Sequence, residues 1–310
     1  MRTYSRQYSD GNVMIMKTKE IRAYGKVNLG LDITGIRPDG YHLVKMIMQT
    51  VDVYDEITVT ADGMTEKKDA YSISITCSDP EVPTDERNLA YKAAKLIMDR
   101  YELSGKVEIS IVKHIPAAAG MAGGSADGAA VITAMDELYE LHMDQAEKDS
   151  IALKLGADVP FCLRRGTYLS EGIGEILTCV APIPHCYMVI IKPDFGISAL
   201  WAYRAYDEYL KEHKDTPDIH PDIDGLISAL EKGSIKDMAA CMGNVLEPAA
   251  LAEYPQIARV RNIMTGMGAE AALMSGSGPV VFGIFTDENR ADDAFNSFSE
   301  DDYGKFKIKF

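Results

Sequence analysis

The sequence has little positive charge and no long hydrophobic run. No apolar stretch approaches the ~18 residues that a membrane-spanning helix requires. Lysine and arginine total 32 against 47 aspartates and glutamates, which gives a formal net charge of −15. Nucleic acids and anionic membranes are polyanions, so this balance predicts neither as a partner. A phosphorylated ligand would need donors supplied locally by its own site.

Cysteine is also scarce, and its spacing matches neither a disulfide framework nor a metal motif. The five cysteines are odd in number and form no C-x-x-C pair, and the six histidines show no metal-ligand spacing. This predicts reduced thiols in a cytoplasmic protein, with neither a disulfide scaffold nor a zinc site. Residues 1–19 carry basic residues but no hydrophobic h-region, so they do not form a secretory signal. We expect them to be a disordered extension, and translation could also begin at Met14 or Met16.

The remaining chain shows strands and helices in mixed order. A length of 310 residues, 46% hydrophobic and 25% charged, is typical of a soluble protein of two domains. Strands and helices without strict βαβ alternation predict an α+β fold. We place the domain boundary near Gly166, which gives domains at 20–166 and 167–310. The predicted strands are 23–33, 43–51, 56–60, 71–76, 106–113, 167–169, 173–178 and 186–192, two around 275–278, and a short one at the end. Helices are predicted at 88–101, from the glycine turn at 120–124 onward, and at 144–155, 198–212, 222–231, 234–242 and 255–265, with one more before the last strand.

A glycine-rich turn opens one of these helices. Gly120, Gly123 and Gly124 follow the strand at 106–113 and lead into a helix whose apolar stripe is Ala126, Ala130, Ala134, Leu138 and Leu141. Glycines allow a ligand close to the backbone, and a helix N-terminus attracts anions, so phosphate is the expected occupant. The turn lacks the Gly-Lys-Ser/Thr of a Walker loop, and Ala122 stands where a dinucleotide loop has its second glycine. The alternative is a turn that is glycine-rich only for tight packing.

Three further clusters are individually weak. Lys26 and Asn28 share one face of the first strand, where an isolated lysine is usually solvated. Asp158 follows a helix-ending glycine and could be a simple cap or turn residue. Met274-Ser-Gly-Ser-Gly-Pro279, between two strands, could hold phosphate as a backbone nest or be a plain hairpin turn.

In this order, the clusters resemble the motifs of the GHMP kinase superfamily, which includes homoserine, mevalonate and galactose kinases. The resemblance covers Ile21 to about Phe285. It implies an N-terminal mixed α/β ATP-binding domain and a C-terminal α+β substrate domain. Three segments, Arg37–His42, Gly156–Phe161 and Gly196–Tyr203, resemble one branch of the superfamily. That branch transfers phosphate from ATP to the 2-hydroxyl of 4-diphosphocytidyl-2-C-methyl-D-erythritol, in the non-mevalonate route to isoprenoid precursors.

The resemblance implies a role for each matched residue. Lys26 and Asp158 would be catalytic, flanking the acceptor hydroxyl, with Asp158 as its base. Tyr41 and Tyr203 would sandwich the cytosine, and Asn28, His42, Gly276 and Ser277 would complete the substrate site. Mg²⁺ should accompany ATP, with Ser125 as its protein ligand. The ATP loop would be Pro116, Ala117, Ala118, Ala119, Gly120, Met121, Ala122, Gly123, Gly124, Ser125 and Ala126. Apart from the small-molecule cytidine diphosphate substrate we expect neither a nucleic acid nor a membrane as a partner, and we expect a monomer or weak homodimer.

The sequence departs from the superfamily pattern at three positions. Ala122 replaces a frequent Gly and Ala126 a frequent Ser, and both changes should leave the backbone cradle working. Ala199 replaces a common Thr, which puts one contact to substrate phosphate in doubt. Three alternatives stay open: a GHMP kinase for another small alcohol, a non-catalytic ATP-binding regulator, and a nicotinamide dehydrogenase. Asp39-Gly-Tyr-His42 disfavours the first, the pair of Lys26 and Asp158 disfavours the second, and the failed G-x-G-x-x-G spacing disfavours the third.

Overall fold

The computed structural model of the chain describes residues 2–9, 12–62, 71–213 and 220–310. The chain divides into two compact units whose segments alternate along the sequence. Unit 1 comprises Met1–Gly25, Val53–Ile115 and Gly123–Arg164, and unit 2 comprises Lys26–Asp52, Pro116–Ala122 and Arg165–Phe310. The long strands β2 (Asn12–Ile36) and β3 (His42–Asp62) each contribute one part to each unit.

Unit 1 is built on a mixed sheet. Its strands follow the order β1–β2–β3–β5–β4, and the strands not yet bounded are β1 (Arg2–Ser9), β4 (Tyr71–Cys77) and β5 (Gly105–Val112). β3 and β5 are antiparallel, whereas β4 and β5 are parallel. The alternating apolar residues of β5, Val107, Ile109 and Ile111, are at most 2% exposed. This alternation, visible in the sequence, directs one face of the strand into the core.

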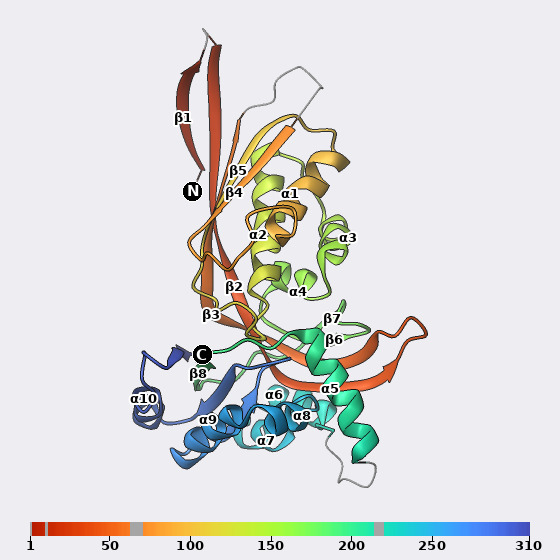
Figure 1. The fold of residues 1–310 in the computed structure, drawn as a ribbon, viewed down its shortest axis with the longest axis vertical. Helices are drawn as coiled ribbons and strands as arrows, with labels where there is room; N and C mark the ends of the chain where they lie inside the picture. Colours follow the sequence, from red (N-terminus) through yellow and green to blue (C-terminus); the bar gives the residue numbers. More distant parts are fainter. Residues whose placement is uncertain (1, 10–11, 63–70, 214–219) are drawn as a thin grey trace. The chain divides into compact units, whose positions relative to one another are not determined.

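Four helices accompany this sheet. They are α1 (Leu89–Arg100), α2 (Gly123–Tyr139), α3 (Gln145–Leu155) and α4 (Val159–Arg164). α1 packs against β4 and β5, and α2 packs against the other three helices (Figure 1). Ala126, Ala130, Ala134 and Leu138 are at most 5% exposed, so the predicted apolar stripe of α2 is confirmed for these four residues. The fifth, Leu141, lies beyond the end of the helix.

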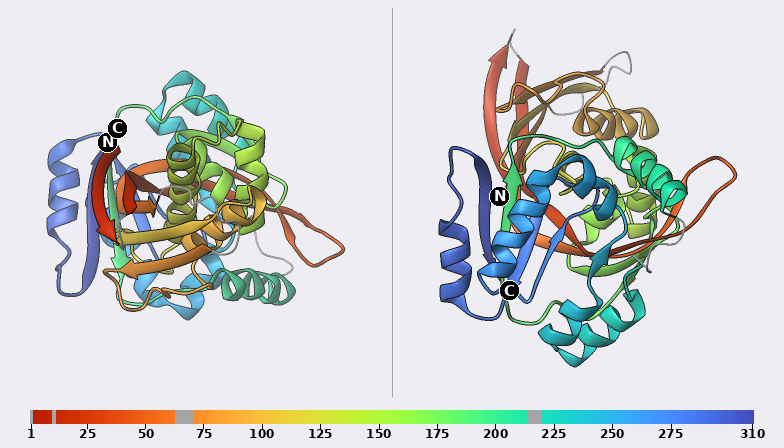
Figure 2. Two further views of the ribbon diagram at one scale, coloured as in Figure 1. Left: turned by 90° about the horizontal axis from the view of Figure 1, so that it is seen from above. Right: turned by 60° about the horizontal axis from the view of Figure 1, so that its bottom comes forward.

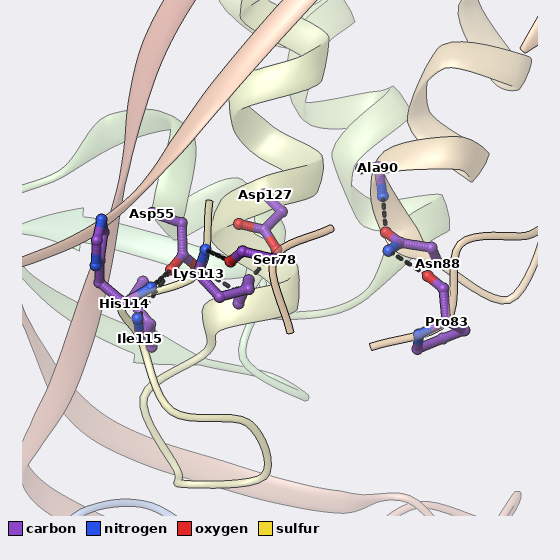
Figure 3. A network of polar contacts seen from close by, with 9 residues as sticks. All are labelled: Asp55, Ser78, Pro83, Asn88, Ala90, Lys113, His114, Ile115 and Asp127. Atoms are coloured by element: carbon purple, nitrogen blue, oxygen red, sulfur yellow. Dashed lines mark hydrogen bonds and ion pairs between the residues drawn. The ribbon is translucent and has the colours of Figure 1, made fainter. Parts of the chain in front are cut away.

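Side chains cap two of the helices of unit 1, α1 and α3. The Asn88 Oδ1 atom accepts the backbone N–H of Ala90 at 2.8 Å, and its Nδ2 donates to the Pro83 carbonyl at 2.7 Å (Figure 3). Asp144 caps α3 by accepting from the Glu147 N–H at 2.8 Å. Each cap satisfies a backbone donor that has no partner within its helix.

Unit 2 contains an antiparallel sheet. The order is β10 (Ala271–Met274), β11 (Val281–Phe285), β8 (Tyr187–Pro193) and β12 (Tyr303–Lys309). The helices α9 (Pro255–Gly266) and α10 (Glu288–Asn296) pack on it (Figure 2). β8 and β11 are the central strands, and every residue of β11 is buried. Such continuous apolar strands are expected where both faces of a sheet are covered.

The last part of β2 and the first part of β3, which belong to unit 2, carry the remaining strands of that unit. β6 (Thr167–Glu171) pairs with β3 and with β7 (Ile176–Cys179), and β9 (Gly243–Asn244) pairs in parallel with β2. The other helices are α5 (Ala199–Glu212), α6 (Ile223–Lys232), α7 (Ile235–Cys241) and α8 (Glu247–Glu253). Ser198 caps α5, and Gly233 ends α6 in the left-handed region with φ +66°.

The structure confirms most of the predicted elements and differs at identifiable places. The predicted strands 43–51 and 56–60 form one continuous β3, because Asp55, which interrupts the apolar pattern, is fully buried and hydrogen-bonded. α4 and α8 were not predicted. Both are short, and Pro160 and Pro248 lie in their first turns, where proline is tolerated although it suggests a break in the sequence.

The ends and boundaries of the predicted domains also differ from the structure. Arg2–Ser9 and the start of β2 form an antiparallel pair, whereas we expected residues 1–19 to be a disordered extension. Met1, Asp10 and Gly11 of that extension lie outside the described residues. The boundary predicted at Gly166 is close to the final passage from unit 1 to unit 2 after Arg164. The two units are interleaved, however, whereas we expected two continuous domains.

Two expectations from composition can be compared with the described residues. None of their helices is both long and apolar enough to span a bilayer. All five cysteines lie within the described ranges and are free in the structure.

Candidate functional site

Lys26 lies at the centre of the polar groups in unit 2. Its side chain is buried at 5% exposure, so the alternative of a solvated surface lysine is wrong. Lys26 Nζ donates to Asn28 Oδ1 at 2.7 Å and to the Gly120 carbonyl at 2.9 Å. The two side chains share one face of β2, as their spacing predicted, and the opposite face carries the buried Val27 and Leu29. Both faces of this part of β2 are therefore buried.

Ser275 connects the first glycine loop, Pro116–Ala122, to β2. Its hydroxyl donates to the Gly120 carbonyl at 3.2 Å and accepts the backbone N–H of Asn28 at 3.3 Å. Gly120 has φ +75°, and a Cβ atom there would lie 2.2 Å from the Ser275 carbonyl oxygen. Only glycine fits at this position, so the Gly120 carbonyl is held beside the Lys26 ammonium.

The loop from Pro116 to Ala122 has positive φ at alternate residues. Ala118, Gly120 and Ala122 have φ angles of +49°, +75° and +57°. Alternation with left-handed residues is the backbone pattern of an anion-binding nest. Alanine in this region costs roughly 1–2 kcal/mol relative to a right-handed conformation. The departure at Ala122 therefore keeps the backbone geometry for which glycine is usual, at some cost in strain.

The second glycine loop, Met274–Pro279, lies next to the same lysine. A Cβ atom on Gly276, which has φ +56°, would lie 3.1 Å from Asn28 Oδ1 and 3.2 Å from Lys26 Nζ. Asn244 holds this loop by donating from Nδ2 to the carbonyls of Met274 and Gly276, each at 2.8 Å. Both glycine loops are therefore brought together at Lys26 within unit 2.

Glu247 supports the second loop from behind. Its Oε1 accepts the Met274 N–H at 3.0 Å, and its Oε2 accepts from Arg261 Nη1 at 2.9 Å. Burial raises the pKa of Glu247, and the Arg261 guanidinium opposes that rise. The position of the loop is thus set by two side chains, Asn244 and Glu247, that the sequence motif did not include.

A group of aromatic side chains lies at the start of β3 and on α5. The His42 ring stacks on Tyr203 with 4.9 Å between centroids and meets Tyr206 edge-on at 6.3 Å. His42 Nε2 is hydrogen-bonded to Asp207 Oδ1 at 2.8 Å. This bond fixes the orientation of the imidazole, so that its Nδ1 edge faces away from Asp207. Tyr41 is 61% exposed, so its side chain is available to a ligand.

Unit 1 holds the other predicted site residues. Gly123 is the first residue of α2, and Ser125 and Ala126 follow in its first turn. Asp158 is half-buried and directly precedes α4, where its carbonyl accepts the Cys162 N–H at 3.2 Å. Lys26 and Asp158 belong to different units, so their convergence stays a prediction. The described residues contain no group of three His, Cys, Asp or Glu side chains that could form a metal cage.

Sequence reasoning missed the residues that support the site. Asp207, Asn244, Glu247 and the hydroxyl of Ser275 all have specific partners there. Asp207 comes four residues after Tyr203 on α5, so helical spacing could have drawn attention to it. Asn244 and Glu247 lie about 30 residues before the loop they hold, and no local pattern marks them.

The comparisons with known proteins agree with this geometry. The family model described as the GHMP kinases N terminal domain matches residues 88–166, and the GHMP kinases C terminal model matches 226–304. A 4-diphosphocytidyl-2-C-methyl-D-erythritol kinase from Lachnoclostridium phytofermentans is 43% identical over 92% of this chain and 94% of its own length. The enzyme of that name from Clostridium botulinum is 43% identical over 90% of this chain and 95% of its own.

A solved structure gives the same result at the level of the fold. It is a 4-(cytidine 5'-diphospho)-2C-methyl-D-erythritol kinase, which superposes with a TM-score of 0.76 at 29% identity. The superposition covers 94% of this chain and 98% of that one.

Proposed function

The chain belongs to the GHMP kinase family, and we propose that it transfers the γ-phosphoryl group of ATP to the 2-hydroxyl of 4-diphosphocytidyl-2-C-methyl-D-erythritol. The products are the 2-phosphate and ADP. The acceptor is proposed because relatives that match nearly the whole chain are named as kinases of this alcohol. The same matches make this a step of the non-mevalonate route to isoprenoid precursors.

The observation that carries this proposal is that Lys26 is buried and its ammonium donates only to neutral oxygens within the described residues of unit 2. A buried cation is normally paired with a carboxylate, because burial without a partner is costly. Within the described residues of unit 2, Lys26 Nζ donates to two neutral oxygens, on Asn28 and Gly120. An ammonium carries three hydrogens, so one donor and the full positive charge are left for a ligand. An anion such as the transferring phosphoryl group suits this position.

The backbone from Ala118 to the first turn of α2 supports the nucleotide part of the proposal. The nest at Ala118–Ala122 supplies N–H donors, and the N-terminus of α2 supplies more. Phosphoryl transfer asks a protein mainly for alignment and for neutralisation of charge, which these donors and Lys26 would provide. Asp158 would accept the proton of the acceptor hydroxyl or position that hydroxyl, a role typically worth about 10²–10⁴-fold.

Mg²⁺ is proposed as the companion of ATP. It usually binds through phosphates, water and one or two protein oxygens, so the absence of a three-residue cage among the described residues is compatible with it. Ser125 in the first turn of α2 would be its protein ligand. When bound, the ion neutralises charge on the phosphate oxygens.

The aromatic group of unit 2 supports the cytidine part. Tyr203 and the exposed Tyr41 would stack on the pyrimidine, a contact worth roughly 1–3 kcal/mol per base in nucleic-acid sites. Stacking does not select a base, so His42, oriented by Asp207, would read the ring edge. Gly276 and Ser277 would contact the substrate from the second glycine loop.

The test is a coupled ADP-release assay with the purified protein and a panel of alcohols. We expect turnover with 4-diphosphocytidyl-2-C-methyl-D-erythritol and little with homoserine or mevalonate, and NMR of the product should place the new phosphate on O2. Release of ADP that does not depend on the acceptor would favour a nucleotide-binding regulator. Turnover with another alcohol alone would refute the proposed substrate.

The catalytic assignments are tested with two variants. Asp158→Asn should keep nucleotide affinity while kcat falls by about 10²–10⁴-fold. Lys26→Met should lose at least as much, because it removes the charge next to the γ-phosphoryl. Asp149→Asn, a carboxylate that pairs with Arg164 in unit 1, and Lys106→Met, a surface lysine that pairs with Glu108, are the matched controls. A near-normal kcat for Asp158→Asn removes that residue from the mechanism.

A further inference from the structure

We propose that Asp55, Lys113 and Asp127 form a positioning cluster that fixes the two ends of the nucleotide loop. The inference rests on the proposed function in one respect, which is that the loop between Ile115 and Gly123 binds ATP. All three residues belong to unit 1, and none was among the predicted site residues.

Asp55 fixes the entry to the loop. Its side chain is fully buried in β3, and Oδ1 accepts the backbone N–H groups of His114 and Ile115 at 2.6 and 2.8 Å (Figure 3). These are the last two residues before the loop begins. The carboxylate therefore replaces the strand partner that the backbone loses where β5 ends at Val112.

Lys113 joins the entry of the loop to its exit. Its ammonium donates to Asp55 Oδ2 and, at 2.9 Å, to Asp127 Oδ2. Asp127 is on α2, two residues after Ser125, so one side chain links the end of β5 to the beginning of the helix. The backbone N–H of Lys113 is itself held by Ser78 Oγ at 2.9 Å, and Figure 3 shows these contacts together.

Gly123 packs directly on this connection. A Cβ atom there would lie 3.2 Å from Lys113 Nζ and 3.0 Å from Ile115 Cγ2. The first residue after the loop thus closes against the last residue before it, with the ammonium beside them. A side chain on Gly123 would separate the two ends, which gives this glycine a packing role distinct from contact with phosphate.

Simple stabilisation does not account for the cluster. Lys113 and both carboxylates are almost completely buried, and apolar residues of similar volume often stabilise a core as well as a buried ion pair does. The cluster is also incompletely satisfied, because Asp127 Oδ1 is buried without a hydrogen-bond partner. What the cluster does specifically is fix the relative position of the two ends of the loop, because its three side chains bind both of them.

The experiment compares Lys113→Met with Lys148→Met. Lys148 pairs at 2.7 Å with Asp136, which lies on α2 more than two turns after Asp127. This control therefore also removes a lysine–aspartate pair that involves α2. Affinities for ATP and for the cytidine alcohol are measured by calorimetry, and amide hydrogen exchange is measured on the free proteins.

We expect Lys113→Met to weaken ATP binding at least tenfold and to leave the affinity for the alcohol within threefold. Exchange should rise at 114–126 and stay unchanged in the sheet of unit 2. Lys148→Met should keep wild-type ATP affinity. Wild-type ATP affinity and wild-type exchange at 114–126 in a folded Lys113→Met protein would overturn the proposal.

A second pair of variants tests the positioning cluster if Lys113→Met does not fold. Asp127→Asn keeps an oxygen acceptor for Lys113 and should bind ATP within threefold of wild type, whereas Asp127→Ala should lose at least tenfold. Equal affinities for these two variants would also overturn the proposal. A wild type that binds ATP but phosphorylates no cytidine alcohol would refute the proposed function and leave this inference standing.

Discussion

Replacing Gly276 by alanine should damage catalysis more than it damages folding. The residue has φ +56°, and its Cα faces the polar centre of unit 2. A new methyl group would lie 3.1 Å from Asn28 Oδ1, 3.2 Å from Lys26 Nζ and 3.3 Å from the Gly120 carbonyl oxygen. Each contact is tighter than a methyl group ordinarily makes, so these atoms must move by a few tenths of an ångström.

The two consequences of the substitution have different sizes. Left-handed alanine costs roughly 1–2 kcal/mol, which lowers the free energy of unfolding. In the role proposed for Lys26, displacement of its ammonium would act on the transition state, where a shift of ~1 Å can cost about 100-fold. A few tenths of an ångström should therefore reduce kcat by roughly tenfold. Nucleotide affinity should change less, because the methyl group crowds only the Gly120 carbonyl oxygen of the first loop, which is not one of its N–H donors.

Gly233→Ala is the matched control. Gly233 has φ +66°, and a Cβ atom there would meet no other atom within 4 Å. The control therefore carries the same backbone strain without crowding any neighbour. Urea unfolding should show similar losses of stability for the two variants, while steady-state kinetics should show a reduced kcat for Gly276→Ala alone. Equal kcat values for the two proteins would refute the assignment of Lys26 to the reacting centre.

Two further predictions concern Asp207 and Asp127. Asp207→Ala should raise KM for the cytidine alcohol about fivefold and leave KM for ATP unchanged, because the lost hydrogen bond to His42, worth ~1 kcal/mol, orients only the pyrimidine side. Glu208→Gln, a change at the exposed neighbouring residue, is the control. A parallel rise in both KM values would contradict this role for Asp207. Burial raises the pKa of Asp127 to about 7, against the pull of Lys113. Because the folded state then holds this proton more tightly than the unfolded state, its contribution to stability is complete below about pH 4 and is lost as the pH rises towards 7. The free energy of unfolding of Asp127→Asn, measured in urea from pH 5 to 8, should fall less steeply than that of wild type, and identical slopes would show that Asp127 does not titrate in this range.

The sequence predicted those features that depend on local patterns. Alternation placed β5 and the part of β2 at 23–33, although β2 begins at Asn12, and the helices predicted from 144 and 198 begin one residue later, after the caps Asp144 and Ser198. The order of the glycine-rich motifs was enough to identify the family. These signals succeed because period, capping and turn chemistry are properties of a few consecutive residues.

The features that the sequence did not predict depend on contacts between distant segments. Asp55 looks like an interruption of a strand until the backbone of His114 and Ile115 is seen to satisfy it. Asn244 is an ordinary polar residue until the carbonyls of the second glycine loop are placed beside it. No spacing rule relates such partners, because the fold alone brings them together.

The alternation of the two units along the chain has a consequence for biosynthesis. Lys26 and Gly120 leave the ribosome long before Ser275 and Asn244, although all four meet within unit 2. A nascent chain released at Gly166 would hold the ammonium and the first loop without the residues that clamp them. The polar cluster around Lys26 can therefore form only after nearly the whole polypeptide has been synthesised, and a clone cut at the apparent domain boundary would yield two fragments that each lack part of it.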